Sequence, residues 1–315
     1  MMMPEDRRVL PHWLQRMLLA MLVVFVVTTL TFFLMHLVPG DPYTTSIENI
    51  SQQERETYIK ENGLDKPLCV QYLMFLKKML LKGDLGTSMV NRTTTVCDIL
   101  KSSLVTSVCL GSIAVCMAVC IGFALGAVSS YSKSSSTKTF LSLLCISGIS
   151  LPVFVWAPLL QSYLGCKLRL FPISGWGTVS HLVLPVLCLL PNTLATTMKY
   201  TRNSIEKIRK SEYYIAIKQR GMGEWKIFRR HIIKNALPPI VTILVANLSG
   251  IFSGAFIVEK IFSVPGIGRQ FMTAITMRDY TILIGLNIVF TVVYVCFRLL
   301  GDFAQELCNP LFREE

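Results

Sequence analysis

Long apolar runs alternate with shorter polar segments along the whole chain. A helix needs about 20 mainly apolar residues to cross the hydrocarbon core of a bilayer. Six runs qualify, which predicts an all-α fold, a polytopic membrane protein with six transmembrane helices. The runs are Met17–Leu37, Leu104–Val128, Phe140–Leu164, Leu182–Met198, Pro239–Val258 and Thr281–Leu300.

The composition also favours a membrane protein. Of the 315 residues, 52% are hydrophobic and 16% are charged, whereas about a quarter of the residues in a soluble domain are charged. The net charge of +12 does not indicate nucleic-acid binding, because the cations lie between apolar runs and not on one soluble face. Membrane lipid with anionic headgroups and a cytoplasmic protein partner are the expected counterparts.

The distribution of Lys and Arg predicts the orientation, because cytoplasmic loops carry the excess of these residues. With both termini inside (N-in/C-in), the cytoplasmic segments hold seventeen Lys and Arg and the two short outer loops hold five. The cytoplasmic segments are 1–16, 129–138, 199–236 and 303–315, and the short outer loops are 165–181 and 259–280. The first apolar run is too long for a signal peptide, so we expect it to be a retained helix.

We expect three parts along the chain. Residues 1–103 form an N-terminal transmembrane helix plus a long extracytoplasmic loop, residues 104–303 form a core of five helices, and residues 304–315 form a cytoplasmic tail. Within the core, segment 199–236 carries eleven cations and three acids. This excess is larger than orientation requires and indicates a second role.

The pattern of segment 199–236 predicts two short helices separated by glycines. Ser211 is the predicted N-cap of the first helix, and Glu212 lies in its first turn, where the helix dipole favours an anion. Gly221 suits the left-handed residue that follows a helix. The segment is either an amphipathic helix lying on lipid headgroups or a docking element for a cytoplasmic partner.

The second predicted helix begins near Glu224. Its periodicity places Trp225, Phe228 and Ile232 on one face. We expect it to end before Leu237, because the double proline that follows interrupts helical hydrogen bonding.

The residues of this segment resemble the EAA loop of bacterial ABC importer permeases. They are Glu212-Tyr213-Tyr214-Ile215-Ala216, Gly221, His231 and Asn235-Ala236-Leu237-Pro238. In that family, the short helix before the glycine sits in a groove of the ATPase subunit. The resemblance therefore implies an ATPase-coupling role for Glu212, Tyr213, Ala216, Gly221, Leu237 and Pro238. Tyr213 stands where the family usually has a small residue.

The resemblance extends over nearly the whole chain and is to the B-type subunit of the oligopeptide/dipeptide/nickel branch. The spaced matches are 38–42, 63–68, 83–88, 259–269 and 278–280. Residues 101–106 depart from the family's usual Leu-Pro-x-Thr-Leu. The resemblance implies the type I ABC importer permease fold for residues 104–303, with 199–236 as the coupling segment.

The same resemblance implies a permease subunit of an ATP-driven, binding-protein-dependent importer in the bacterial inner membrane. Oligopeptides or dipeptides are the first expectation for its cargo, with nickel or another small solute as the alternative. The implied partners are a sister permease in a heterodimer, two cytoplasmic ABC ATPase subunits and an extracytoplasmic substrate-binding protein. ATP and Mg would be used by the ATPase partners, and we expect this chain to bind no cofactor.

The chain lacks residues for energy conversion or catalysis of its own. None of its 19 glycines is followed by Lys, so the P-loop that binds ATP is absent. No Asp or Glu lies inside the six runs, which makes a secondary transporter or channel a remote alternative. Gly148-Ile149-Ser150 alone does not support an intramembrane hydrolase, because no HExxH motif occurs. We expect no catalytic residue, and without a CxxC or Cys/His cluster we expect no metal site.

The outer loop 259–280 contains a predicted turn. Val264-Pro265-Gly266 suits a type II turn in which Gly266 takes a positive φ, and Gly268 allows a second turn. The resemblance implies that Pro265, Gly266 and Gly268 cap the translocation path on the outer side. The alternative is a simple connector between two spans.

The long outer loop contains a partly helical stretch, Gln71–Lys82. Tyr72, Phe75, Leu76 and Met79 form a stripe that we expect to pack against the outer ends of the spans, with contact to a substrate-binding protein as the alternative. The outer-side cysteines are Cys69, Cys97 and Cys166, an odd number that leaves any disulfide open.

Small and polar residues inside the spans predict contacts between helices. Gly122–Gly126 and Gly250–Gly254 allow two helices to approach closely. The candidates for a water-lined translocation path are Asn192, Asn247, Ser253 and Asn287. The alternative for each of these polar residues is a hydrogen bond between helices.

Overall fold

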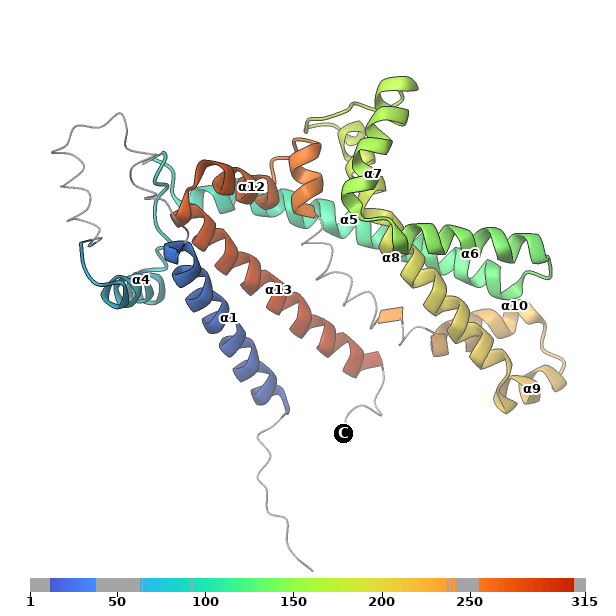
Figure 1. Cartoon of the computed structure of the whole chain (residues 1–315). Coiled ribbons are helices and arrows are strands. Elements are labelled where there is room, and N and C mark those ends of the chain that lie inside the picture. The colour runs from blue at the N-terminus through green and yellow to red at the C-terminus, as the bar shows by residue number, and fades with distance from the viewer. Residues whose placement is uncertain are drawn as a thin grey trace, which may run out of the picture. The chain divides into compact units, whose positions relative to one another are not determined.

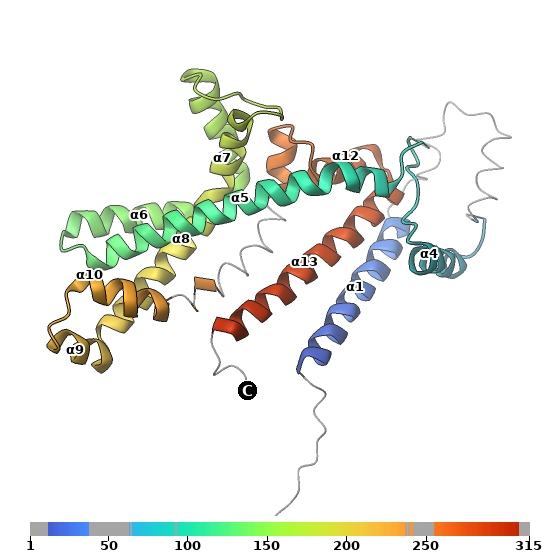
Figure 2. The same cartoon turned by 180° about the vertical axis from the view of Figure 1, so that it is seen from behind.

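The computed structural model describes residues 12–37, 63, 65–91, 93–236, 238, 240–241 and 255–308. Most of these residues are helical (Figures 1 and 2). Contacts between residues divide the chain into two compact units, which are described separately. The first unit comprises residues 1–100 and 273–299, and the second comprises 101–272 and 300–315. The expected division into 1–103, 104–303 and 304–315 stays a prediction.

Two long helices lie side by side in the first unit. They are α1 (His12–Leu37) and α13 (Tyr280–Cys308), of which residues 280–299 belong to this unit (Figures 1 and 2). The Asn287 side-chain amide of α13 donates a hydrogen bond to the Thr31 hydroxyl of α1. Much of the remaining surface of α1 consists of exposed large apolar side chains, as expected of a helix that faces lipid.

A short amphipathic helix, α4 (Leu68–Lys82), packs on this pair. Its Tyr72, Phe75 and Met79 contact a cluster built on Phe32 of α1 and on α13. The Tyr72 hydroxyl is 2.6 Å from the Thr29 hydroxyl of α1. The prediction that this stripe packs against the spans is confirmed for Tyr72, Phe75 and Met79, and Leu76 is not part of the cluster.

Asp279 ties segment 84–95 to the start of α13. Its buried carboxylate accepts hydrogen bonds from the Ser88 hydroxyl, the Met89 N–H (3.3 Å) and the Ile282 N–H (3.2 Å). A buried carboxylate needs such donors, because burying it without partners would cost several kcal/mol. Asp279 therefore fixes the conformation of residues that precede it by about 190 positions.

Glycines let two helices of the second unit approach closely. α5 (Val96–Tyr131) packs on α8 (Val179–Arg209) at Gly122 and Gly126. A Cβ atom at either glycine would lie 2.7 Å from a backbone carbonyl oxygen of α8. The predicted close approach at Gly122–Gly126 is confirmed, whereas Gly250–Gly254 lies outside the described residues.

The third predicted span is wrong as a single straight helix. α6 (Ser135–Ser150) and α7 (Val153–Leu160), which continues into the π-helix η1 (Gln161–Lys167), meet at an angle of 107°. Leu151 is extended, with ψ of 122°, and Pro152 follows it. A residue before proline is driven out of the helical region by steric clash, which ends α6 at this point.

Within the described residues, four helices are long and apolar enough to cross a membrane, or five if the bent pair counts as one span. The four are α1, α5, α8 and α13. Most of the predicted fifth run, 239–258, lies outside the described residues. The structure therefore agrees with an all-α, multi-pass fold and leaves the count of six as a prediction.

Candidate functional site

The basic segment 199–236 continues directly from a membrane helix. α8 extends through Arg209, beyond the predicted end at Met198, and α9 (Glu212–Gln219) begins three residues later. The Ser211 side chain accepts a hydrogen bond from the Tyr214 N–H (3.4 Å) at the start of α9. The predicted N-cap is confirmed, and Glu212 lies in the first turn.

Gly221 ends this helix in the left-handed conformation that the sequence predicts. Its φ is +75°, and its N–H donates to the Lys218 carbonyl oxygen (3.1 Å). A Cβ atom at this position would meet nothing within 4 Å. Glycine is therefore required here for its backbone conformation and not for space.

The two faces of α9 differ in exposure. Tyr214 and Ile217 are buried and pack with Ile205 of α8 and with Ile227 and Ile232 of the next helical segment. The opposite side of α9 presents exposed residues: Glu212, Tyr213, Ile215 and Ala216. Half-exposed Tyr213 and Ile215 are large apolar groups in water or at a headgroup surface, which is typical of a binding surface.

A second contact braces α9 against the helical segment that follows it. The Tyr213 hydroxyl lies 2.7 Å from Nδ1 of His231, and the two rings are edge to face with centroids 5.8 Å apart. Tyr213 is thus both part of the exposed side of α9 and a link to the next element.

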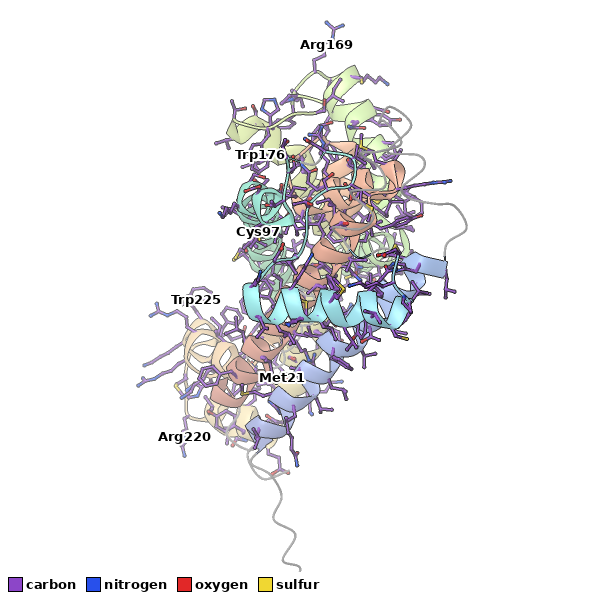
Figure 3. All side chains as sticks on the ribbon, turned by 90° about the vertical axis from the view of Figure 1, so that its left-hand side faces the viewer. Met21, Cys97, Arg169, Trp176, Arg220 and Trp225 are labelled. Atoms are coloured by element: carbon purple, nitrogen blue, oxygen red, sulfur yellow. The ribbon has the colours of Figure 1, made fainter. Side chains whose placement is uncertain are left out.

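The predicted apolar face of the second helix is partly wrong. Trp225 is 70% exposed, whereas Ile227 and Ile232 are each 1% exposed. α10 (Glu224–Ile227) passes into a π-helix, η2 (Phe228–Ile232), whose i→i+5 hydrogen bonds widen the turn, so the 3.6-residue period assumed for this face does not hold. The exposed ring of Trp225 and the side chain of Arg220 are visible in Figure 3.

The helix continues through Ala236, and Pro238 is also helical. Leu237, a predicted coupling residue, lies outside the described residues. We expected the second helix to end before Leu237. The structure differs from this prediction, because Pro238 is still helical.

The loop 259–280 does not form the predicted type II turn. Gly266 has no positive φ, and Ser263 takes the left-handed conformation instead (φ 55°). A Cβ atom at Gly266 would overlap the carboxylate of Glu259, and one at Gly268 would overlap the backbone of Phe256. These glycines are required for close approach and not for a positive φ.

Glu259 organises this loop and was not singled out in the sequence. It is fully buried, and its carboxylate accepts hydrogen bonds from the Ser107 hydroxyl (2.7 Å), the Gly268 N–H (2.7 Å) and the Arg269 N–H (3.2 Å). The Ser107 oxygen in turn accepts the Ile267 N–H (2.8 Å). Burial raises the pKa of the Glu259 carboxyl, and the three hydrogen bonds oppose that rise.

The candidate path residues are described one by one, because Asn192 and Asn287 belong to different units. Asn192 is exposed on α8, and its backbone carbonyl oxygen accepts the Thr196 hydroxyl (2.8 Å). Asn287 makes the interhelical hydrogen bond to Thr31 described above. Asn247 and Ser253 lie outside the described residues.

Among the residues that the structure describes, no group of three or more His, Cys, Asp or Glu is placed to hold a metal ion. Cys69, Cys97 and Cys166, which we expected on the outer side, carry free thiols.

Comparison with known proteins decides the family. Residues 118–314 match the family described as "Binding-protein-dependent transport system inner membrane component", and residues 9–110 match the N-terminal region of the same kind of component. The chain belongs to this family. The permease is accordingly a multi-pass inner-membrane protein of a bacterial ABC importer, and no enzymatic family is indicated.

Its relatives include named transport permeases. The dipeptide transport system permease protein DppB of Lactococcus lactis subsp. cremoris is 32% identical, over 95% of this chain and 98% of the relative. The glutathione transport system permease protein GsiC of Pectobacterium atrosepticum is 30% identical, over 96% and 99%.

A solved structure shares the fold. The inward-facing MetNI methionine ABC transporter has a chain that superposes with a TM-score of 0.57, at 11% identity, covering 67% of this permease and 96% of that chain. This confirms the ABC permease fold and, at such low identity, supports nothing about cargo.

The contacts of Glu259 generate a test. Glu259→Gln replaces one acceptor oxygen with an amide group, so at least one buried donor loses its partner, at a cost of about 1–3 kcal/mol. Amide hydrogen exchange at Gly268 and Arg269 should become faster in the purified protein. The neighbouring exposed substitution Lys260→Gln is the control and should leave exchange unchanged. Equal protection in both variants would contradict the anchoring role.

Proposed function

We propose that the chain is the permease subunit of an ATP-driven, binding-protein-dependent importer of dipeptides or oligopeptides. Its cargo is inferred from the names of relatives that align over more than nine-tenths of the chain. The observation that carries the coupling mechanism is the exposed side of α9 on a helix whose other side is fixed to α8.

The proposed assembly has five components. This chain and a sister permease form the translocation path between them, two cytoplasmic ABC ATPase subunits bind and hydrolyse ATP with Mg, and an extracytoplasmic binding protein delivers cargo. Six spans with both termini inside complete the topology, so segment 199–236 faces the ATPases. This chain has no P-loop of its own, and energy therefore enters from the partner subunits.

The contacts of α9 supply a physical route for that energy. Glu212, Tyr213 and Ala216 would contact the ATPase groove, while buried Tyr214 and Ile217 hold α9 to the end of α8. α8 is one helix of 31 residues, so displacement of α9 moves a membrane helix with it. Switching a two-state path from 1:99 to 99:1 needs about 5.5 kcal/mol of differential binding. The rigid attachment of α9 to α8 transmits this binding energy to the membrane helix, whereas a loose loop would not.

On the outer side, the loop that contains Pro265, Gly266 and Gly268 is assigned the capping role. Its attachment to Glu259 and Ser107 supports this assignment, because a cap must keep its shape to close a path. Asn192, Asn247, Ser253 and Asn287 stay as candidates for lining the path.

Uptake measurements test the function directly. Deleting the gene should abolish ATP-dependent uptake of labelled di- or oligopeptides into cells, and the intact chain should restore it. Competition with nickel ions and with glutathione separates the alternatives. Retained peptide uptake in the deletion strain, together with lost nickel uptake, would reassign the cargo and leave the permease role in place.

Ala216→Asp tests the docking side of α9. Ala216 is exposed in this chain, so the variant should fold normally. In the complex it would bury an unpaired charge, at a cost of several kcal/mol. We expect ATPase subunits to be lost on purification and uptake to fall. Ser136→Asp, an exposed substitution in the other cytoplasmic loop, is the control. Normal ATPase retention by Ala216→Asp would argue against docking at α9.

Gly221→Ala tests the C-terminal end of α9. An alanine at φ +75° costs about 1 kcal/mol of backbone strain, so we expect α9 to fray and uptake per ATP hydrolysed to decrease. Gly223→Ala is a matched control, because Gly223 also has open space around it but has φ of −62°. The same coupling ratio in both variants would show that the left-handed residue is not needed for transmission.

A further inference from the structure

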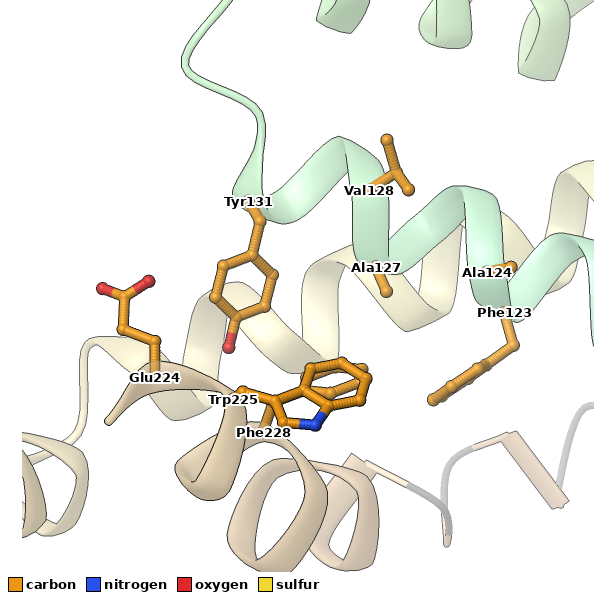
Figure 4. A pocket seen from close by; sticks show the side chains of 8 residues that line it. All are labelled: Phe123, Ala124, Ala127, Val128, Tyr131, Glu224, Trp225 and Phe228. Atoms are coloured by element: carbon orange, nitrogen blue, oxygen red, sulfur yellow. The ribbon is translucent and has the colours of Figure 1, made fainter. Parts of the chain in front are cut away.

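A cavity is formed partly by segment 199–236 and lies away from the exposed residues of α9 that the docking proposal uses. It has a volume of about 480 Å³ and lies within the second unit, between the end of α5 and the start of the α10–η2 helical segment (Figure 4). Phe123, Ala124 and Tyr131 line it from α5, and Trp225 and Phe228 line it from the other side. A volume of this size is typical of ligand pockets.

The wall of the cavity is aromatic and apolar. Trp225 stacks on Phe228 with centroids 5.6 Å apart, and Phe228 meets Tyr131 edge to face at 5.7 Å. The indole of Trp225 stays largely exposed at this position. Tryptophan is enriched where the hydrocarbon of a membrane meets water, because its ring is apolar and its N–H is polar.

A polar atom in the wall lacks a partner. The Tyr131 hydroxyl is buried and has no hydrogen-bond partner within the described part of the chain. Figure 4 shows it pointing toward Trp225 and Phe228. A buried hydroxyl without a partner is costly, so an occupant that offers an acceptor oxygen here would be favoured.

Cations adjoin two of the lining residues, Trp225 and Phe228, in the sequence. Lys226, Arg229 and Arg230 are exposed on the same helical segment as Trp225 and Phe228. Glu224 is the one acid in the lining, and it lies 3.6 Å from Lys218 in an ion pair. The unbalanced charge next to the apolar wall therefore favours an occupant with an anionic head and an apolar body.

We propose that the cavity binds an acyl chain of an anionic phospholipid from the cytoplasmic leaflet. The chain fills the apolar wall, an ester oxygen accepts the Tyr131 hydroxyl, and the phosphate lies near Lys226 and Arg229. The proposal rests on the proposed cytoplasmic placement of segment 199–236. A lipid bound here would join α5 to the segment that packs under α9, and would stiffen the base of the coupling helix.

Fluorescence quenching by brominated lipids tests the proposal. Substituting Trp13, Trp156 and Trp176 with Phe in the full chain leaves Trp225 as the reporter. In vesicles, brominated phosphatidylglycerol should quench Trp225 about fivefold more effectively than brominated phosphatidylcholine, as expected for a cation near an anionic headgroup. The double variant Lys226→Gln, Arg229→Gln should lose this preference. Lys77→Gln, Lys78→Gln removes the same charge from α4 and should keep it.

A second variant checks that the cavity itself is occupied. Ala124 is an exposed residue of the lining, so Ala124→Phe should fill the cavity without disturbing the fold and should reduce quenching. Ile146→Phe, on an exposed position of α6, is the control for size. Equal quenching by the two lipids, or full quenching in Ala124→Phe, would overturn the proposal.

The result of the lipid-quenching test can be distinguished from the result of the ATPase-docking test. If added ATPase subunits abolish quenching by phosphatidylglycerol, the cavity belongs to the protein interface and the lipid proposal fails. Ala216→Asp should leave quenching unchanged whether or not it retains the ATPases. Failure of the lipid site thus leaves docking at α9 intact, and failure of docking leaves the lipid site intact.

Discussion

The structure of segment 199–236 depends on the burial of one side of α9. Tyr214 and Ile217 pack against Ile205 at the end of α8 and against Ile227 and Ile232, so a helix of eight residues is held in one orientation. An isolated helix of this length is unstable in water, because nucleation is costly. Tertiary contacts and end caps therefore create the exposed side that a partner would contact, and removing either would leave a flexible loop.

The parts of the site that were predictable are those that depend on near neighbours. A serine followed by an acidic residue and a glycine nine residues after Glu212 determine the two ends of α9 through bonds that span three or four positions. The apolar stripe of α4 was predictable for the same reason, because its residues are near neighbours within one helix. The π-helix η2 was not predictable, because it departs from the 3.6-residue period that the sequence analysis assumed. Trp225 and Phe228 do share a side, whereas Ile232 is buried and Trp225 is exposed.

Other features depend on residues far apart in the chain. Glu259 meets Ser107 across 152 positions, and no local pattern marks that pair. The acid was passed over because it follows a predicted span, and its glycines were interpreted as turn formers although they provide space for a carboxylate. The bend at Leu151–Pro152 was available from local rules. The continuous apolar character of that region led to the prediction of one straight span.

Asp279 has a consequence for biogenesis. Its carboxylate holds Ser88 and Met89, which are synthesised about 190 residues earlier. A ribosome adds roughly 5–20 residues per second, so this segment waits for at least several seconds before its anchor emerges. During that interval it has no native partner at Asp279, and truncated or stalled chains would leave this segment open to proteolysis.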